Sequence, residues 1–220
     1  MNWPNESKEY RSARDELLQA EIALRRTEEA VAVQRRALPP GGAVPEDYVF
    51  DGVDGSVRMS ELFGDKDTLY LYNFMYRPGE QGLALEGPCP SCTSIIDGVD
   101  GAARHLTQAV ALAVVAKVPI ERFRAWGDGR GWRFAPLFSS ANNTFNRDYL
   151  AEDEHELQSP IASVFTKHEG VIRHSWSSEL FNAPTDPGQN PRHVDYMWPF
   201  WAMLDRTPEG RSVSEPKLEY

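Results

Sequence analysis

The chain has 220 residues, of which 41% are hydrophobic and 11% aromatic, enough for one domain with a packed core and some additions. Its formal net charge of −10 opposes attraction to phosphate backbones and anionic lipid, which argues against nucleic acid and membranes as partners. No apolar run approaches the roughly 20 residues that cross a bilayer, and the first residues lack the apolar core of a signal peptide. We therefore expect a cytoplasmic protein.

The first predicted element is a long helix over residues 5–36, which contain neither Gly nor Pro. Residues spaced alternately three and four apart mark one face of it. Two Ala and one Thr weaken this face as a coiled-coil seam, so packing on its own domain and a dimerisation arm are both open. Pro39 and Pro40 end the helix. The face consists of Tyr10, Ala13, Leu17, Ala20, Leu24, Thr27 and Val31.

Strand-like and helix-like patterns then alternate, which implies parallel strands in a central sheet. The predicted elements are a hairpin at 49–57, a helical turn at 59–63, a buried strand at 68–75, a loop at 76–88, a helix at 90–108, a buried strand at 110–116, a helix at 119–126 with Gly127 beyond its end, a short strand at 134–139 and a polar helix or loop at 146–157.

After Pro160 the pattern changes to two β-runs, 161–167 and 171–176, separated by a turn with Gly170. This order predicts an antiparallel hairpin. A turn-rich loop follows at 182–191, and the aromatic segment 193–204 is expected to form a helix that serves core packing, an oligomer interface or a ligand pocket. The predicted organisation is a helical extension over 1–40, a domain over 41–211 and a loose tail over 212–220.

The chain contains two cysteines, Cys89 and Cys92, in a Cys-x-x-Cys spacing that follows the buried strand at 68–75. Two thiols at this spacing can close a disulfide. Free N–H groups and the helix dipole lower the pKa of a cysteine at the start of a helix, so Cys89 is the expected attacking thiol and Cys92 the resolving one. Pro90 suits the first turn, and the N–H groups of Ser91 and Cys92 stay available to the sulfur of Cys89.

Other readings of the two cysteines remain. In one alternative the two cysteines are inert buried thiols, since free Cys packs as a small hydrophobe. Structural zinc is disfavoured because only His105 follows at short range, whereas a soft two-thiolate site for copper(I) stays chemically open. Three aromatic residues would either border the thiols or pack in the core: Tyr72, Tyr76 and Trp126. Arg77 and Glu86 would either tune the thiolate or lie in solvent.

The order of these parts resembles the thioredoxin fold: a buried strand, a Cys-x-x-Cys that opens a helix, a further strand and helix, then Pro160 and a hairpin. More closely, the chain is similar to a bacterial group of thioredoxin-like proteins, domain of unknown function 899, described as predicted dithiol-disulfide oxidoreductases. The matching features are the N-terminal helix, Tyr72–Met75, Gly87–Thr93, Trp132–Phe138, Val164–Phe165 and Asp205–Arg211.

The resemblance implies an α/β thioredoxin-like fold, with a central mixed sheet flanked by helices, a long N-terminal helix and a C-terminal helical extension. It also implies that Ser159, Pro160 and Ile161 form a cis-proline loop that shapes a substrate groove, with Pro160 beside Cys89. Two features differ from thioredoxin proper: the longer loop before the Cys-x-x-Cys motif, and Pro90-Ser91 between its cysteines. Glu86 stands where a peroxiredoxin would place a threonine, which makes a peroxidase the lesser alternative.

The leading functional hypothesis is a thiol-disulfide oxidoreductase that works through a mixed disulfide and needs no metal or cofactor beyond the Cys89–Cys92 disulfide. Its substrate would be a disulfide-bearing protein or a small-molecule disulfide. The alternative is a thioredoxin-fold binding or oligomerisation module, a homodimer through the N-terminal helix or the 193–204 segment, in which the cysteines are non-catalytic or redox-sensing.

Overall fold

The computed structural model describes residues 3–77, 87–213 and 215–219. It forms two compact units, Met1–Gly41 and Gly42–Tyr220. In the described part of the chain, no helix is both long enough and apolar enough to cross a membrane.

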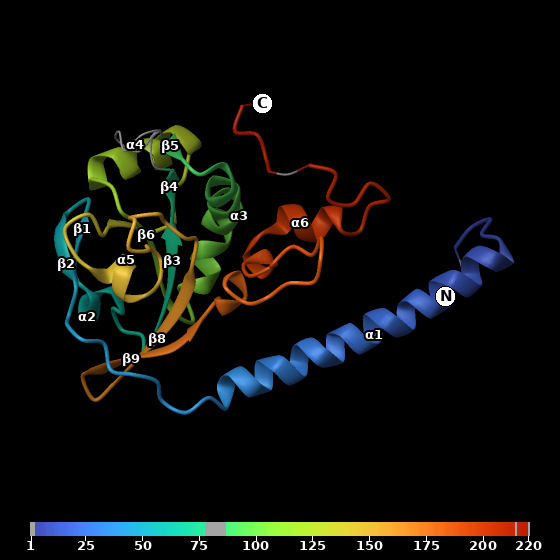
Figure 1. Ribbon diagram of the computed structural model, residues 1–220, viewed down its shortest axis with the longest axis horizontal. Helices are drawn as coiled ribbons and strands as arrows, with labels where there is room; N and C mark the ends of the chain where they lie inside the picture. The colour runs from blue at the N-terminus through green and yellow to red at the C-terminus, as the bar shows by residue number, and fades with distance from the viewer. Residues whose placement is uncertain (1–2, 78–86, 214, 220) are drawn as a thin grey trace. The chain divides into compact units, whose positions relative to one another are not determined.

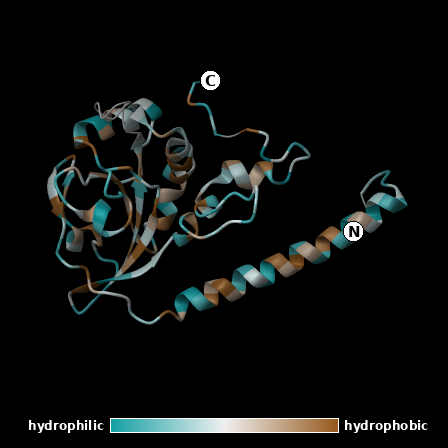
Figure 2. Ribbon diagram, in the orientation of Figure 1, coloured by the Kyte–Doolittle hydropathy of each residue, from teal (hydrophilic) through white to brown (hydrophobic). Residues whose placement is uncertain are grey.

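The first unit is dominated by helix α1, Lys8–Arg36. Ser7 caps its start, where the Ser7 side chain accepts a hydrogen bond from the Tyr10 N–H at 3.1 Å. The predicted long helix is thus confirmed. None of its residues is buried, and apolar and polar bands alternate along it (Figure 2). The seam residues Leu17 and Leu24 are 50% and 59% exposed.

The second unit is built on a seven-stranded mixed sheet with the strand order β2-β1-β7-β6-β3-β8-β9 (Figure 1). A separate two-stranded sheet pairs β4 with β5. The strands of the large sheet are β1 (Val49–Gly52), β2 (Gly55–Arg58), β3 (Thr68–Phe74), β6 (Ala111–Ala116), β7 (Leu137–Ser139), β8 (Ala162–His168) and β9 (Val171–Ser177); those of the small sheet are β4 (Tyr76–Arg77) and β5 (Gly87–Pro88).

The central strands β3 and β6 are apolar on both faces because each face carries its own core. Tyr72, Phe74 and Val114 belong to one cluster, while Leu71 and Val115 belong to the other. Helices α3 (Pro90–Leu106) and α4 (Ile120–Arg130) contribute to the first cluster, and α2 (Met59–Leu62) and α5 (Phe145–Asp148) to the second. This two-sided burial explains why both strands appear as continuous apolar runs in the sequence.

The strand directions confirm the predicted thioredoxin-like fold. β3 is followed by α3 and by the parallel strand β6, and β8 then pairs antiparallel with β3 on its other side. β8 and β9 form the predicted antiparallel hairpin. The four strands β6-β3-β8-β9 therefore have the order and directions of the thioredoxin core, with the N-terminus of α3 at the carboxyl end of β3.

Several predicted boundaries are wrong for identifiable reasons. Gly127 lies inside α4, which continues to Arg130 and ends at Gly131 in the left-handed conformation (φ 78°). The aromatic segment is not one helix, because the extended backbone of Trp198 (φ −120°, ψ 89°) separates a 3-10 turn, Asp195–Met197, from α6, Pro199–Leu204. The predicted helix over 90–108 is confirmed, because α3 continues through Gly98 and Gly101 to Leu106.

The residues that follow the first unit run along the outer strand β9. The N–H of Val44 donates to the carbonyl of Ile172 at 3.0 Å, and the N–H of His174 donates to the carbonyl of Gly42 at 3.0 Å. Ala43 forms an antiparallel bridge with Arg173. Residues 42–44 therefore act as a short additional strand on this edge of the sheet.

Candidate functional site

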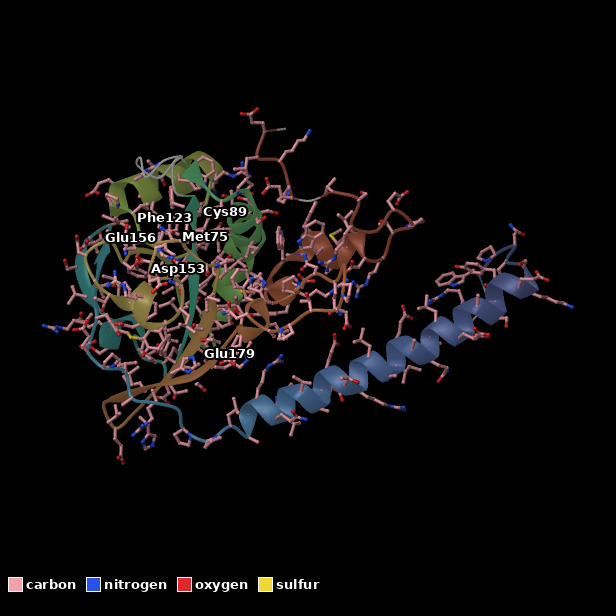
Figure 3. The ribbon with its side chains drawn as sticks, viewed as in Figure 1. Met75, Cys89, Phe123, Asp153, Glu156 and Glu179 are labelled. Carbon is pink, nitrogen blue, oxygen red and sulfur yellow. The ribbon has the colours of Figure 1, made fainter. Side chains whose placement is uncertain are left out.

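The Cys-x-x-Cys motif opens helix α3, as the sequence predicts. Cys89 is the N-cap residue and Pro90 stands in the first turn. The Cys89 N–H donates to the carbonyl of Met75 at 3.0 Å, just after β3. The carbonyl of Cys89 accepts hydrogen bonds from the Thr93 N–H and the Thr93 hydroxyl, both at 2.9 Å. These bonds fix the backbone of Cys89 between the sheet and the helix (Figure 3).

Both cysteines are free thiols, and both are buried. Cys92 has no exposed surface and Cys89 only 4%. Cys89 is the more accessible of the two, but it is not an exposed thiol. It shares a core cluster with Val194, Trp198 and Trp201 of the C-terminal segment, and Trp198 Nε1 donates a hydrogen bond to the Ser94 hydroxyl of α3 at 3.0 Å.

The two thiols sit in different electrostatic surroundings. Burial is the main cause that raises the pKa of the Cys92 thiol well above its ordinary value, and the neighbouring Cys89 raises it further. The Tyr72 hydroxyl donates to Cys92 Sγ at 3.3 Å, which partly opposes this rise. Burial also raises the pKa of Tyr72 well above its usual range, so its hydroxyl stays protonated. The Cys92 thiol therefore stays protonated at neutral pH.

Both thiols line one pocket of about 360 Å³. Its floor comes from β3 and α3, and its remaining wall comes mostly from the C-terminal segment after Ser178. The lining residues are Tyr72, Met75, Cys89, Ser91, Cys92, Ile95, Pro160, Phe181, Asn190, Pro191, His193, Val194, Asp195, Trp198, Trp201 and Glu215.

The structure brings only some of the expected site residues to this pocket. Ser91 and Pro160 line it with the two cysteines, whereas Ser159 and Ile161 do not. Ile161 is 2% exposed and lines a second pocket of about 320 Å³ instead. The peptide bond before Pro160 is trans, as are all those of the described residues, so the cis-proline that the resemblance implied is not found.

The remaining candidates do not line this pocket or fall outside the described residues. Tyr76 is a core residue that packs against Phe74 and Phe123, with ring centroids 5.7 and 6.2 Å away. Burial raises the pKa of Tyr76 to about 12. Trp126 approaches the motif through Thr93, to whose hydroxyl its Nε1 donates at 3.3 Å. Glu86 falls outside the described residues.

One residue of the pocket was not singled out from the sequence as a site residue. His193 lines the pocket with both cysteines. The Phe181 ring packs on the His193 ring with centroids 4.8 Å apart, and the main chain of Pro160 opposes the lowering of the His193 pKa by burial. The sequence indicated a ligand pocket only as one possible role of the whole 193–204 segment, and it gave no signal specific to His193.

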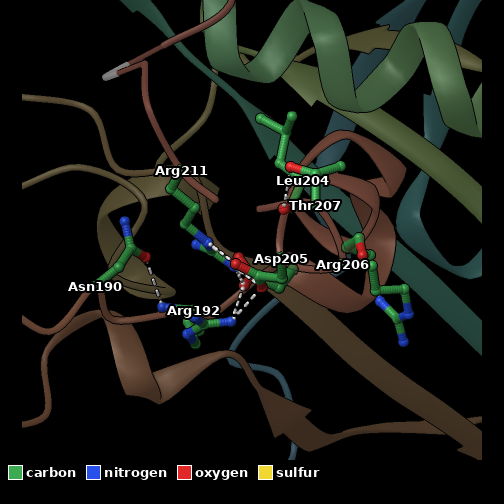
Figure 4. A network of polar contacts seen from close by, with 9 residues as sticks. Asn190, Arg192, Leu204, Asp205, Arg206, Thr207 and Arg211 are labelled. Carbon is green, nitrogen blue, oxygen red and sulfur yellow. Dashed lines mark hydrogen bonds and ion pairs between the residues drawn. The ribbon is translucent and has the colours of Figure 1, made fainter. Parts of the chain in front are cut away.

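A network of charges holds the wall of the pocket (Figure 4). Arg211 donates to both carboxylate oxygens of Asp205 at 2.8 Å and also pairs with Asp195. Arg192 donates to Asp205 at 2.6 Å. Arg211 and then Arg192 hold the pKa of Asp205 well below its usual range. The guanidinium of Arg211 also covers the Trp201 ring, 5.0 Å from its centroid.

Fold and motif together define the class: a thioredoxin-like protein with a Cys-x-x-Cys dithiol at the first turn of α3, enclosed by a C-terminal extension. The chain belongs to the family described as bacterial protein of unknown function (DUF899), whose model matches residues 2–220. This confirms the resemblance to that group. No curated protein matches the chain.

Solved structures similar to the chain include three from bacteria. The hypothetical protein SMc02350 of Sinorhizobium meliloti is 18% identical over 72% of this chain and 80% of its own, with a TM-score of 0.44. Peroxidoxin BcpB of Mycobacterium tuberculosis is 16% identical over 73% and 94%, with a TM-score of 0.45. The exposed lipoprotein thioredoxin Etrx1 of Streptococcus pneumoniae is 14% identical over 69% and 96%, with a TM-score of 0.42.

Proposed function

We propose that this protein is a thiol-disulfide oxidoreductase in which Cys89 attacks a substrate disulfide and Cys92 resolves the mixed disulfide. The observation that carries the proposal is the pair of free thiols at the start of α3, both lining one pocket. The asymmetry between them supports the order of attack. Cys92 is fully buried with a raised pKa, which makes it a poor first nucleophile, whereas Cys89 is the more accessible thiol and stands at the start of the helix.

The reaction then follows ordinary thiol-disulfide exchange. The Cys89 thiolate attacks one sulfur of the substrate, the substrate S–S bond breaks, and the first substrate thiol leaves. Cys92 next attacks Cys89 Sγ in the mixed disulfide and releases the second thiol. The substrate is reduced by two electrons, and the dithiol is oxidised to the Cys89–Cys92 disulfide, which an external thiol must reduce again.

The pocket favours a small-molecule disulfide over a protein disulfide. Pockets that bind small molecules measure roughly 300–1,000 Å³ and have mainly apolar walls. This pocket of about 360 Å³ is at the lower end of that range, with Trp198, Trp201 and Phe181 in its walls. With only 4% of Cys89 exposed, a flat protein surface would reach the sulfur poorly.

The test compares the reduction of dithiodipyridine, a small aromatic disulfide, with the reduction of insulin. We expect the wild type to reduce the small disulfide faster. Cys89→Ser should lose activity on both, and Cys92→Ser should stop after the first exchange with the mixed disulfide trapped on Cys89, which mass spectrometry detects. Equal rates for the wild type and Cys89→Ser would remove the basis of the proposal.

A second candidate function, self-association through α1, is favoured by a separate observation. The 29 residues of α1 include none that is buried, and its seam presents large apolar side chains such as Leu17 and Leu24 to solvent. A helix of this length with an unburied apolar seam is stabilised when a second helix covers it. This role is compatible with redox activity in the second unit.

A further inference from the structure

His193 lines the dithiol pocket. Its Nε2 is buried and has no hydrogen-bond partner among the described residues. The ring is held by Phe181, 4.8 Å between centroids. In the neutral tautomer with the proton on Nδ1, Nε2 carries the lone pair. A buried polar atom without a partner in a pocket calls for a functional explanation.

The other ionisable groups that face the pocket are less suited to accept a proton from a thiol. Tyr72 already donates its hydroxyl proton to Cys92 Sγ. The Asp195 carboxylate is paired with Arg211 and Arg192. Glu215 is an exposed residue of the C-terminal tail. The two thiols themselves are the groups that must lose protons.

We propose that His193 is the proton acceptor for the dithiol, and that its Nε2 takes the proton of Cys92 when this thiol attacks the mixed disulfide. The proposal rests on the proposed function and adds a catalytic residue to it. Cys92 needs such a partner more than Cys89 does, because it has no exposed surface from which water could remove its proton.

The proton and electron balance of this step closes within the pocket. The Cys92 S–H bond breaks and the proton passes to His193 Nε2. The Cys92 thiolate then forms the S–S bond with Cys89, and the bond between Cys89 and the substrate sulfur breaks. The departing substrate thiolate takes the proton from the His193 imidazolium, which restores the neutral ring. The dithiol is oxidised and the disulfide substrate is reduced.

Burial of the ring is consistent with this role, since desolvation is the main cause that lowers the pKa of His193 below its ordinary value of 6.5, against the opposing effects of Pro160 and Asp195. The ring is therefore neutral at pH 7 and ready to accept a proton. Below its pKa the ring is already protonated, so the resolving step should slow as the pH falls through that value.

The test uses the full chain and rapid mixing with excess dithiodipyridine, whose two thiones are released in two phases. The first phase reports attack by Cys89 and the second reports resolution by Cys92. His193→Gln and His193→Asn should slow the second phase about 100-fold at neutral pH, the usual size of a general-base effect, and leave the first phase nearly unchanged. The control is His168→Gln, because His168 is exposed at the end of β8.

The Asn variant tests proton transfer, since its amide keeps a polar side chain at this position but offers no basic nitrogen. A wild-type second phase in His193→Asn would overturn the proposal and leave His193 a positioning residue. For the wild type, a second phase that does not slow at any pH below 6.5 would also overturn it, because the ring becomes protonated in that range. This measurement needs no variant to fold.

The same experiment separates this inference from the proposed function. If Cys89→Ser releases no thione while the His193 variants behave as the wild type, only the role of His193 fails. If Cys89→Ser still releases thione at the wild-type rate, the oxidoreductase proposal itself fails.

Discussion

At the residue scale, the contact between Tyr72 and Cys92 affects how readily the buried thiol ionises. The Tyr72 hydroxyl donates a hydrogen bond to Cys92 Sγ at 3.3 Å. A hydroxyl that donates to sulfur stabilises the thiolate more than the thiol. Tyr72 thus offsets part of the burial that raises the pKa of Cys92.

Tyr72→Phe should therefore raise the pKa of Cys92 further and slow its reactions. A hydrogen bond to a charged group contributes about 1.5–3 kcal/mol, so the resolving phase should slow about ten-fold or more. Tyr70→Phe is the matched control, because the Tyr70 hydroxyl contacts Tyr196 and Met197 rather than a cysteine. An unchanged resolving phase in Tyr72→Phe would show that the hydroxyl does not act on Cys92.

Site residues could be predicted where their immediate sequence neighbours identify them. The cysteine spacing, with Pro90 at the first turn, identifies the helix start from a few neighbouring residues. His193 is about a hundred residues away, in a loop without periodicity, and only the packing of the C-terminal segment brings it to Cys92. The burial of Cys89 has no local signal either, since its core cluster includes Val194, Trp198 and Trp201, which are about a hundred residues further along the chain.

At the element scale, packing between α3 and α6 depends on a glycine. A Cβ on Gly98 would lie 3.2 Å from Pro199 Cδ and 3.4 Å from its Cγ. Gly101, one turn further along α3, has nothing within 4 Å of that position. Gly98 thus allows α6 to pack closely against α3, although glycine inside a helix lowers helix stability.

These two glycines make a matched pair of substitutions. Gly101→Ala should stabilise the protein by up to about 1 kcal/mol, because alanine favours the helix and meets open space. Gly98→Ala should lose that gain or destabilise the protein by about 1 kcal/mol through overpacking against Pro199. Urea unfolding followed by tryptophan fluorescence measures both. Equal gains would mean that Pro199 moves away without cost.

The elements themselves show where sequence patterns stop being sufficient. β3 and β6 were predictable because each is an apolar run buried on both faces. The end of α4 was not, because Gly127 is present for packing rather than for termination: a Cβ there would lie 2.8 Å from Leu137 Cδ1 and 3.1 Å from Trp132 Cε3. A glycine that makes room for a neighbour and one that ends a helix look alike in sequence.

At the scale of the whole molecule, the exposed seam of α1 predicts self-association. Leu17→Gln combined with Leu24→Gln should reduce the mass measured by light scattering towards that of the monomer, because both side chains are half or more exposed on the seam. Leu18→Gln is the control, since Leu18 is 42% exposed but lies beside the seam. A monomeric wild type, or an equal effect of the control, would contradict an association through this face.

Residues 42–44 have a further consequence, which concerns aggregation. Unpaired strand edges are templates on which other chains add strands. β9 is an outer strand of the large sheet, and its N–H and carbonyl groups at Ile172 and His174 are occupied by Val44 and Gly42. Residues 42–44 therefore protect the edge of β9 from pairing with strands of other chains. A truncated form that begins at Gly42 keeps this protection, whereas one that begins after Val44 exposes the edge of β9.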